Sequence, residues 1–511
     1  MKTRVDGEPL SVGRRKAIQF GAVAVASTLV AGRSVAQKAE PSVGDRTTEV
    51  IAETGPGYTN NSARAFGNGP MDETTRKLVT YVSSFSESDL TPKIVSACSN
   101  TMLDSIGAIL SGFECEPARI CARMAMTIQS TLKSTVFGYG IVTSPELAAY
   151  ANTSMGRHTD FNDHASDMTP GILAIGEALH LSGTKVMMSI ILAYQINDAL
   201  ASAAALGDSS GWDQGITVGP ATALAVGKLL GLNEDQLANA LSLALVPHIP
   251  MRVARTGTLS MAKGCATAPA VRDAVFSALL AKEGMTGAAQ PFEARDGLWD
   301  RVTGPFKELR LPPRSEPGVG LTGGIKRYPS ESQSHALLEI IPQIRSWTSA
   351  DDIESIRIEV FPHTMMEIGD PPKWDPKNSE TADHSMAYLV AVALIDGEVY
   401  LSSYTPKRIA DTATRQLMNK ITMQMNPEFV RNHQRITVRK KTGEEMTKEV
   451  TSVKPMTREE ISAKFDRVCS FIGLPNAQRD RIRASWSNLQ VVPDIADPIR
   501  DLAHYGNPRP L

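Results

Sequence analysis

Asn152-Thr-Ser-Met-Gly-Arg-His-Thr-Asp-Phe-Asn-Asp-His-Ala-Ser-Asp167 is a polar stretch between two apolar ones, Ala148-Ala-Tyr-Ala151 and Ile172-Leu-Ala-Ile175. Short polar side chains are unfavourable inside a helix because they compete for the backbone hydrogen bonds. The pattern therefore predicts a polar loop held between two buried helices, which is where a scaffold commonly presents functional groups. Composition alone leaves open a solvated loop in which Asp160 and Asp163 cap the next helix.

Helical patterns dominate the sequence on both sides of this stretch. After Thr91-Pro92, apolar residues recur at helical spacing as far as Leu110. Aromatic residues make up only 5% of the chain, which favours a helical body over a β-sandwich. Further helices are predicted at residues 186–206, 220–230, 237–245 after an Asn233 cap, and 266–282.

Strand patterns occur only after about residue 345, where apolar and polar side chains begin to alternate. The predicted elements there are strands at 356–360, 399–404 and 436–440, a turn at Thr442-Gly443 into a strand at 447–453, a capping box from Thr457 to Glu460, and helices at 461–471 and 475–502. The fold class predicted is mainly α with α+β, a large all-helical domain plus a smaller α+β domain.

The predicted segments follow from these patterns. They are a signal peptide at 1–36, a linker or N-terminal arm at 37–70, the helical domain at 71–334, the α+β domain at 335–470, and C-terminal helices at 471–511 that pack back on the helical domain.

The first residues resemble a twin-arginine export signal. Arg14-Arg15 precede an apolar run at 20–31, which is too short to span a bilayer, and Ser34-Val-Ala36 suits cleavage. We therefore expect a periplasmic protein, with an uncleaved tail as the alternative. No later segment is expected to have the apolar length of a membrane helix, so no membrane association is predicted after signal removal.

Charge and cysteine usage exclude several classes of partner and site. The formal net charge is −2, and residues 1–36 carry +4, which leaves −6 on the remainder. A mildly acidic chain without a basic stripe is a poor binder of nucleic acid. The five cysteines include no C-x-x-C pair, so a disulfide framework, an iron–sulfur cluster and a structural zinc site are not expected.

Two lysines at loop-to-helix junctions extend the group of candidate functional residues. Lys263 lies in Ser260-Met-Ala-Lys-Gly-Cys265 and Lys326 in Gly323-Gly-Ile-Lys-Arg-Tyr-Pro-Ser-Glu331. Either alone is more often a surface residue. Together with Arg157 and the acidic and histidine groups of the opening stretch, they suit a polycarboxylate, because Arg binds a carboxylate through two parallel hydrogen bonds and Lys supplies a point charge.

A metal site is the competing interpretation of the same residues. An EF-hand is excluded, because Ala165 stands where that loop requires Gly and Gly171 where it requires Glu. A site made of His158, His164 and Asp160 stays open on ligand type alone.

Five segments carry a family resemblance over about residues 75–500. They are Arg157-His-Thr-Asp-Phe-Asn-Asp163, His164-Ala-Ser-Asp167, Met261-Ala-Lys-Gly-Cys265, Lys326-Arg-Tyr-Pro-Ser-Glu331 and Ser379-Glu-Thr-Ala-Asp-His-Ser385. In these the chain resembles the MmgE/PrpD family, which includes 2-methylcitrate dehydratase and cis-aconitate decarboxylase. The resemblance implies a homodimer with its site in the cleft between domains.

The resemblance also implies a lyase without metal or organic cofactor that dehydrates a small hydroxy-polycarboxylate such as 2-methylcitrate. The implied catalytic residues are Asp160 and His164 as an acid–base pair, Glu331 as a second acid–base group, and Lys263 and Lys326 as cations that stabilise enolate-like charge. The implied substrate-binding residues are Arg157 and Asn162. His384 is interpreted as a structural histidine.

One departure from the family pattern leaves the reaction open. His164 follows Asp163 directly, where relatives have several further residues, and Ala165 replaces the usual Pro. The shorter loop changes the pocket wall, so decarboxylation or epimerisation of a related polycarboxylate are alternatives. A periplasmic polycarboxylate-binding protein without catalysis is a third.

Overall fold

The computed structural model describes residues 70–204, 211–506 and 508–511, which belong to one compact unit at 58–511. The predicted signal peptide and, apart from Pro70, the predicted arm lie outside the described residues. Helices dominate and six short strands occur in the described part of the chain. The prediction of a mainly α protein with an α+β part is therefore confirmed.

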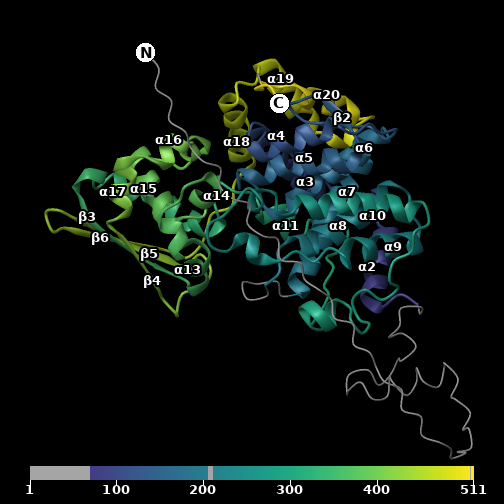
Figure 1. Cartoon of the computed structure of the whole chain (residues 1–511), viewed down its shortest axis with the longest axis horizontal. Coiled ribbons are helices and arrows are strands. Elements are labelled where there is room, and N and C mark those ends of the chain that lie inside the picture. The colour runs from purple at the N-terminus through teal and green to yellow at the C-terminus, as the bar shows by residue number, and fades with distance from the viewer. Residues whose placement is uncertain (1–69, 205–210, 507) are drawn as a thin grey trace, which may run out of the picture. The chain divides into compact units, whose positions relative to one another are not determined.

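The first half of the described chain is helical (Figure 1). Its helices are α2 (Glu73–Ser84), α3 (Pro92–Ser111), α4 (Glu116–Ala125), α5 (Pro145–His158), α6 (Thr169–Ala178), α7 (Gly183–Ala203), α8 (Gly215–Leu229), α9 (Glu234–Leu245), α10 (Ala268–Lys282) and α11 (Val319–Gly323). Asn233 caps α9 with a capping box, as predicted. A small hairpin, β1 (Ser134–Val136) and β2 (Ile141–Thr143), precedes α5.

Helices α3 and α7 are long and apolar enough to cross a membrane by length and composition, so the expectation that no later segment has this character was wrong. In α3, 72% of the apolar window is buried inside the protein, and in α7 83%. These are the properties of core helices, which pass the same test. They pack against α18 and α8 respectively.

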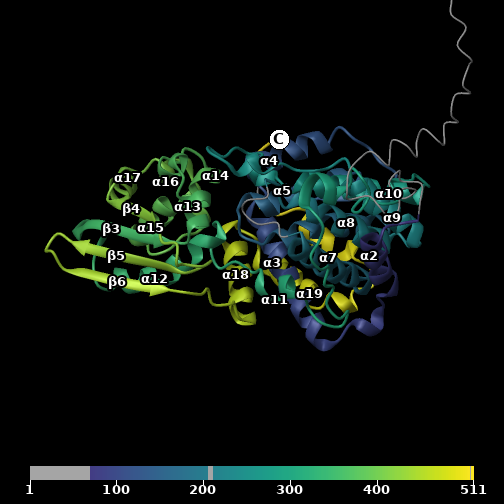
Figure 2. The ribbon, with the colours of Figure 1, turned by 90° about the horizontal axis from the view of Figure 1, so that it is seen from below.

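A four-stranded sheet follows in the order β4-β3-β5-β6. The strands are β3 (Ile353–Val360), β4 (Ile421–Met425), β5 (Gln434–Lys440) and β6 (Glu445–Val450). β5 and β6 form the predicted hairpin, and β3 pairs antiparallel with β5 and parallel with β4. Figure 2 shows this sheet with its helices; α12 packs on β5 and β6, and α15 packs on α12 and α17.

The helices of this part are α12 (His335–Arg345), α13 (Pro362–Ile368), α14 (Ser379–Ala382), α15 (Met386–Asp396), α16 (Pro406–Ile409) and α17 (Thr412–Met418). The strand predicted at 399–404 is wrong, because Leu401–Tyr404 forms a 3₁₀ turn, η10. The reason is local: the Tyr400 N–H donates to the Ser403 hydroxyl, a side-chain-to-backbone bond that competes with strand pairing.

The last helices, α18 (Arg458–Phe471), α19 (Asn476–Ser487) and α20 (Ala496–Ala503), return to the first ones. α18 and α19 pack on α3, and α20 packs on α6, so the yellow end of the chain lies beside the blue helices in Figure 1. One hydrophobic core combines buried residues from 78–321 and 461–505 with Tyr400. A second core uses residues from 337–438.

The polar stretch around which the sequence is organised is only partly a loop. Residues 152–158 belong to α5, residues 159–163 connect, and η3 (His164–Met168) leads directly into α6. The prediction of a loop over its first half was wrong because these polar side chains have partners outside the helix. Asn152, for example, accepts from Phe137 N and donates to the Thr135 carbonyl.

Candidate active site

A cavity of about 370 Å³ collects most of the ionisable residues that the sequence singled out. Its wall contains residues from the helical part of the chain and from the segment after residue 320. Those that matter for the chemistry are Asp160, His164, Lys326, Glu331, His384 and Arg431.

Asp160 lies at the centre of an ionic cluster. Its backbone is left-handed, with φ of 49°, a conformation that Asp tolerates better than most residues. Its carboxylate is bonded by Arg157 Nη2 and by Lys326 Nζ at 3.0 Å, and Lys263 Nζ is 3.9 Å away. Burial alone would raise the pKa of Asp160, but these three cations outweigh burial and hold the pKa well below its usual value.

Neither aspartate that was considered as a helix cap makes a capping bond: Asp163 stands at the start of η3 without one.

Lys326 has no hydrogen left for a substrate. Its ammonium donates to Asp160 Oδ2, to the Asp160 carbonyl at 3.2 Å and to the Ser330 carbonyl at 3.1 Å. Burial lowers the pKa of Lys326, and the neighbouring Asp160 carboxylate opposes this effect. Lys326 therefore acts on the cavity as a fixed positive charge rather than as a free donor.

Arg157 and Asn162 lie behind the cavity wall rather than in it, which corrects their expected role as substrate-binding residues. Arg157 is 1% exposed and is occupied by the protein itself. It bonds Asp160, the Asn162 carbonyl and His164 Nδ1, and lies 3.6 Å from Asp167. A guanidinium with these partners holds the loop at 159–163 in place and is not part of the cavity lining.

Lys263 is also buried behind the wall. It is 0% exposed and sits between two carboxylates, with Nζ 3.5 Å from Asp383 Oδ2 and 3.9 Å from Asp160 Oδ1. Within the described ranges, its ammonium has no hydrogen-bond partner. Its effect on the site is electrostatic, since it links the ionisation of Asp160 to that of Asp383.

His164 does reach the cavity. Its Nδ1 receives a hydrogen bond from Arg157 Nη1 at 3.2 Å and lies 3.3 Å from Asp167 Oδ2. Burial, with the charges of Arg157 and Arg255, holds the pKa of His164 well below its usual value, so the ring is neutral at pH 7. Burial raises the pKa of Asp167 to about 6 against the opposing charge of Arg157.

Glu331 begins the short turn η7 (Ser332–Ser334), where it caps the backbone by accepting from Gln333 N at 2.6 Å. Burial raises the pKa of Glu331, and the charge of Lys326 opposes this only in part. A carboxyl group with a raised pKa in a cavity wall is suited to give a proton to a leaving group.

His384 is the functional candidate that sequence reasoning missed. It lines the cavity, and its Nδ1 is 2.6 Å from Asp383 Oδ1. Burial lowers the pKa of His384 well below its usual value, and burial raises that of Asp383 to about 7 against the opposing charge of Lys263. The adjacent Asp and His at 383–384 were the available signal, but only the fold shows that the ring faces the cavity.

A metal site is not formed by these residues. His158, one of the three candidate ligands, faces Glu380 at 3.8 Å instead of His164 and Asp160. In residues 70–204, 211–506 and 508–511, no group of three or more His, Cys, Asp and Glu side chains is placed to hold a metal ion.

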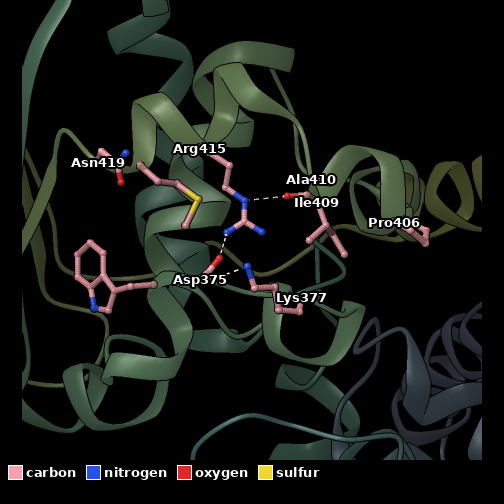
Figure 3. Close-up of a pocket in the computed structure, with 9 residues that line it drawn as sticks. Asp375, Lys377, Pro406, Ile409, Ala410, Arg415 and Asn419 are labelled. Carbon is pink, nitrogen blue, oxygen red and sulfur yellow. Dashed lines mark hydrogen bonds and ion pairs between the residues drawn. The ribbon is translucent and has the colours of Figure 1, made fainter.

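A second cavity, of about 530 Å³, lies beside α16 and α17 and offers different chemistry (Figure 3). Its charged side chains pair with one another: Asp375 accepts from Lys377 at 2.7 Å and from Arg415 at 2.5 Å. Arg415 also donates to the carbonyls of Ile409 and Pro376. Because these charges are already paired, this cavity has no group poised for proton transfer.

Comparison with known proteins gives a consistent family match. Residues 76–309 match the MmgE/PrpD N-terminal domain and residues 328–488 the MmgE/PrpD C-terminal domain. The chain is 25% identical to a cis-aconitate decarboxylase of Aspergillus terreus, over 70% of this chain and 79% of the relative. It is 29% identical to a 2-methylcitrate dehydratase of Salmonella typhi, over 57% of this chain and 64% of the relative. It is 23% identical to a human cis-aconitate decarboxylase, over 84% and 92%.

Proposed function

Because the chain belongs to the MmgE/PrpD family, we propose that it is a cofactor-independent lyase that dehydrates a hydroxy-polycarboxylate such as 2-methylcitrate. The observation that carries the proposal is the cavity wall in which Lys326 and Asp160 pair beside the carboxyl group of Glu331. We further propose, from the sequence alone, a periplasmic homodimer exported by the twin-arginine route.

Dehydration next to a carboxylate requires three things from the protein. A base removes the proton from the carbon alpha to a carboxylate, cations stabilise the enolate-like charge that develops, and an acid protonates the leaving hydroxyl group. Lys326 supplies a fixed positive charge at the cavity. Electrostatic stabilisation of this kind commonly lowers the barrier of such reactions more than any other effect.

Glu331 is suited to be the acid, because it lines the cavity and burial raises the pKa of its carboxyl group, which favours the protonated form. Asp160 is poorly suited to be the base. Both oxygens of its carboxylate are already engaged, Oδ1 by Arg157 and Oδ2 by Lys326, so neither is placed to take a proton from a substrate. We therefore assign Asp160 the task of holding Lys326 at the cavity instead of removing a proton.

Decarboxylation is the second candidate. The relatives named cis-aconitate decarboxylase align over more of the chain than the dehydratase does, 70% and 84% against 57%. Loss of carbon dioxide leaves a carbanion alpha to a carboxylate, which the same cation would stabilise and the same Glu331 could protonate.

The test uses protein lacking residues 1–36 after treatment with a chelator. It is offered 2-methylcitrate, citrate and cis-aconitate, and both ultraviolet absorbance of the conjugated product and release of carbon dioxide are followed. Absorbance that grows from 2-methylcitrate or citrate without carbon dioxide supports the dehydratase. Carbon dioxide from cis-aconitate supports the decarboxylase. Tight binding without turnover indicates a binding protein. If the protein neither binds nor converts any of the three compounds, the proposal is overturned.

A further inference from the structure

His384 and His164 both line the cavity, yet their ring nitrogens are held by opposite kinds of partner. His384 Nδ1 faces the carboxylate oxygen Asp383 Oδ1 at 2.6 Å. An ionised carboxylate can only accept a hydrogen bond. With Asp383 ionised, the ring proton of His384 therefore lies on Nδ1, and Nε2 carries a lone pair.

The partner of His164 is an obligate donor. Arg157 Nη1 lies 3.2 Å from His164 Nδ1, and a guanidinium has no lone pair to offer. Nδ1 must therefore accept, which puts the ring proton of His164 on Nε2. Asp167 Oδ2 lies 3.3 Å from the same Nδ1 and 3.6 Å from Arg157 Nη1. With Arg157 as the donor to Nδ1, this oxygen is a neighbour of the ring nitrogen rather than its hydrogen-bond acceptor.

The free nitrogen of His384 has no competing partner. Among the residues that the structure describes, none is hydrogen-bonded to His384 Nε2. The ring is also anchored from its own segment, since the His384 N–H donates to the Thr381 carbonyl. In His384, Nδ1 is hydrogen-bonded to Asp383, and the lone pair on Nε2 is available. A histidine with this arrangement can accept a proton at Nε2.

The segment of His384 is joined directly to that of Glu331. The Glu331 N–H donates to the Asp383 carbonyl at 3.0 Å. This backbone contact holds a carboxyl group and an imidazole in one wall of the cavity, and the two side chains come from chain positions more than fifty residues apart.

We propose that His384, oriented by Asp383, is the general base of the reaction, and that His164 acts there only as a hydrogen-bond donor. The assignment rests on the proposed lyase function. His384 Nε2 takes the proton from the alpha carbon, and the electrons of that C–H bond form the new C=C bond. The C–O bond breaks, and the leaving hydroxyl group takes a proton from the carboxyl group of Glu331 and departs as water. Both groups then regain their starting protonation by exchange with solvent.

Asp383 is a positioning residue in this scheme, because it acts through the imidazole. Replacing it by Asn would present an amide donor to His384 Nδ1 and would move the ring proton to Nε2. An equivalent exchange in a catalytic Asp–His pair leaves the geometry intact but costs about 10⁴ in kcat. The chain offers a matched pair away from the site: His180 Nδ1 lies 2.8 Å from Asp494 Oδ2 on the surface.

The experiment compares H384Q, D383N and H180Q with the wild type on whichever polycarboxylate the wild type converts. We expect kcat to fall by about 10²–10⁴ in H384Q and D383N, as for loss of a general base, with KM within about threefold. H180Q should be unchanged. Histidine ¹⁵N NMR gives a readout that does not depend on turnover: the resonance lost in H384Q should report a proton on Nδ1 in the wild type above pH 8, and a proton on Nε2 in D383N.

The outcomes separate the two proposals. Absence of wild-type turnover on every polycarboxylate overturns the proposed function, and the base assignment falls with it. Wild-type turnover combined with a kcat of H384Q within about threefold of wild type overturns the base assignment alone. So does a wild-type spectrum that places the proton of His384 on Nε2 above pH 8.

Discussion

Lys326 Nζ donates to Asp160 twice, to Oδ2 at 3.0 Å and to the backbone carbonyl at 3.2 Å, although 166 positions separate the two residues. The contact joins the connection after α5 to the loop before η7, so neither segment can form the charged wall without the other. Because the pair is buried, its charges are little screened by salt.

The first prediction concerns this pair. Lys326→Met keeps most of the side-chain volume but removes the charge and three hydrogen bonds. We expect kcat to fall by about 10²–10³, the usual loss when one electrostatic stabiliser of a developing anion is removed. Steady-state kinetics with circular dichroism as a folding check measures this. Lys420→Met is the control, because Lys420 also donates to a backbone carbonyl, that of Ile353, but lies outside the cavity. Equal activity of both variants would contradict the role of Lys326.

The second prediction is a dependence of activity on pH. His384 can accept a proton at Nε2 only when Asp383 is ionised, because a protonated Asp383 would donate to Nδ1. Burial raises the pKa of Asp383 to about 7, so kcat should be low below that pH and should rise with increasing pH through about 7. The charges that act most strongly on the pKa of Asp383 are those of Lys263, Asp160, His158 and Lys326.

Lys263→Met tests the sign of this dependence. Lys263 lowers the pKa of Asp383, so removing its charge should move the rise in kcat to higher pH, in addition to lowering activity at pH 7. A profile recorded from pH 5 to 9 measures the shift. A shift toward lower pH would show that Asp383 is not the titrating group. The same series can include His164→Ala, for which we expect loss of turnover with the fold intact.

The third prediction concerns a buried ion pair that holds both loops of the site. Lys464, from α18, donates to Asp104 Oδ1 at 2.6 Å, to the Phe161 carbonyl at 2.7 Å and to the Lys326 carbonyl at 2.7 Å. Both side chains are more than nine-tenths buried. Breaking such a pair by removing one partner costs about 3–5 kcal/mol, so Lys464→Met should lower the free energy of unfolding by about this amount.

Lys464→Met should also lower kcat, because the carbonyls next to Asp160 and at Lys326 lose their shared donor. Urea unfolding measures the loss of stability. The double variant Lys464→Met with Asp104→Leu should regain part of the stability, since it removes the unpaired carboxylate, but not the activity. Full recovery of activity in the double variant would show that Lys464 acts on stability alone.

Local signals in the sequence were sufficient for several elements. Asn233 and Thr457 cap α9 and α18 as predicted, because a capping box is specified by residues three positions apart. The hairpin of β5 and β6 was likewise predicted from alternation and a Gly turn. β4 was missed although Ile421-Thr-Met-Gln-Met425 alternates apolar and polar side chains, because five residues at a sheet edge are a short signal.

The site shows where such local reasoning ends. The sequence singled out Asp160, Lys326 and Glu331 together, and the structure places all three in one cavity wall. The sequence analysis expected Arg157 to bind substrate and His384 to be structural. In the structure Arg157 pairs with protein carboxylates, and His384 lines the cavity. That distinction depends on which neighbours tertiary packing supplies to each side chain, and no spacing along the chain encodes it.

The fourth prediction uses one of the confirmed caps. Asn233 Oδ1 accepts from Gln236 N at 2.9 Å at the exposed start of α9. Asn233→Ala should lower the free energy of unfolding by about 1 kcal/mol, the usual cost of losing such a cap. It should leave kcat and KM unchanged, because the cap is not part of the cavity. Thermal unfolding and steady-state kinetics test both statements, and a change in kcat would show that α9 is coupled to the site.

The fifth prediction concerns how the substrate is bound. Arg431 lies in the loop between β4 and β5 and lines the cavity while remaining solvent exposed. Within the part of the chain that the structure describes, its side chain makes one hydrogen bond, a long one of 3.5 Å to the Ser332 hydroxyl. Unlike Arg157 it retains donors for a carboxylate far from the reacting carbon. Contacts made equally in ground and transition states change KM and leave kcat unaltered. We therefore expect Arg431→Gln to raise KM about tenfold, the equivalent of about 1.4 kcal/mol, with kcat nearly unchanged.

Arg435→Gln is the matched control, because Arg435 pairs with Glu359 and Glu449 outside the cavity. A fall in kcat at constant KM would place Arg431 in the chemical step instead.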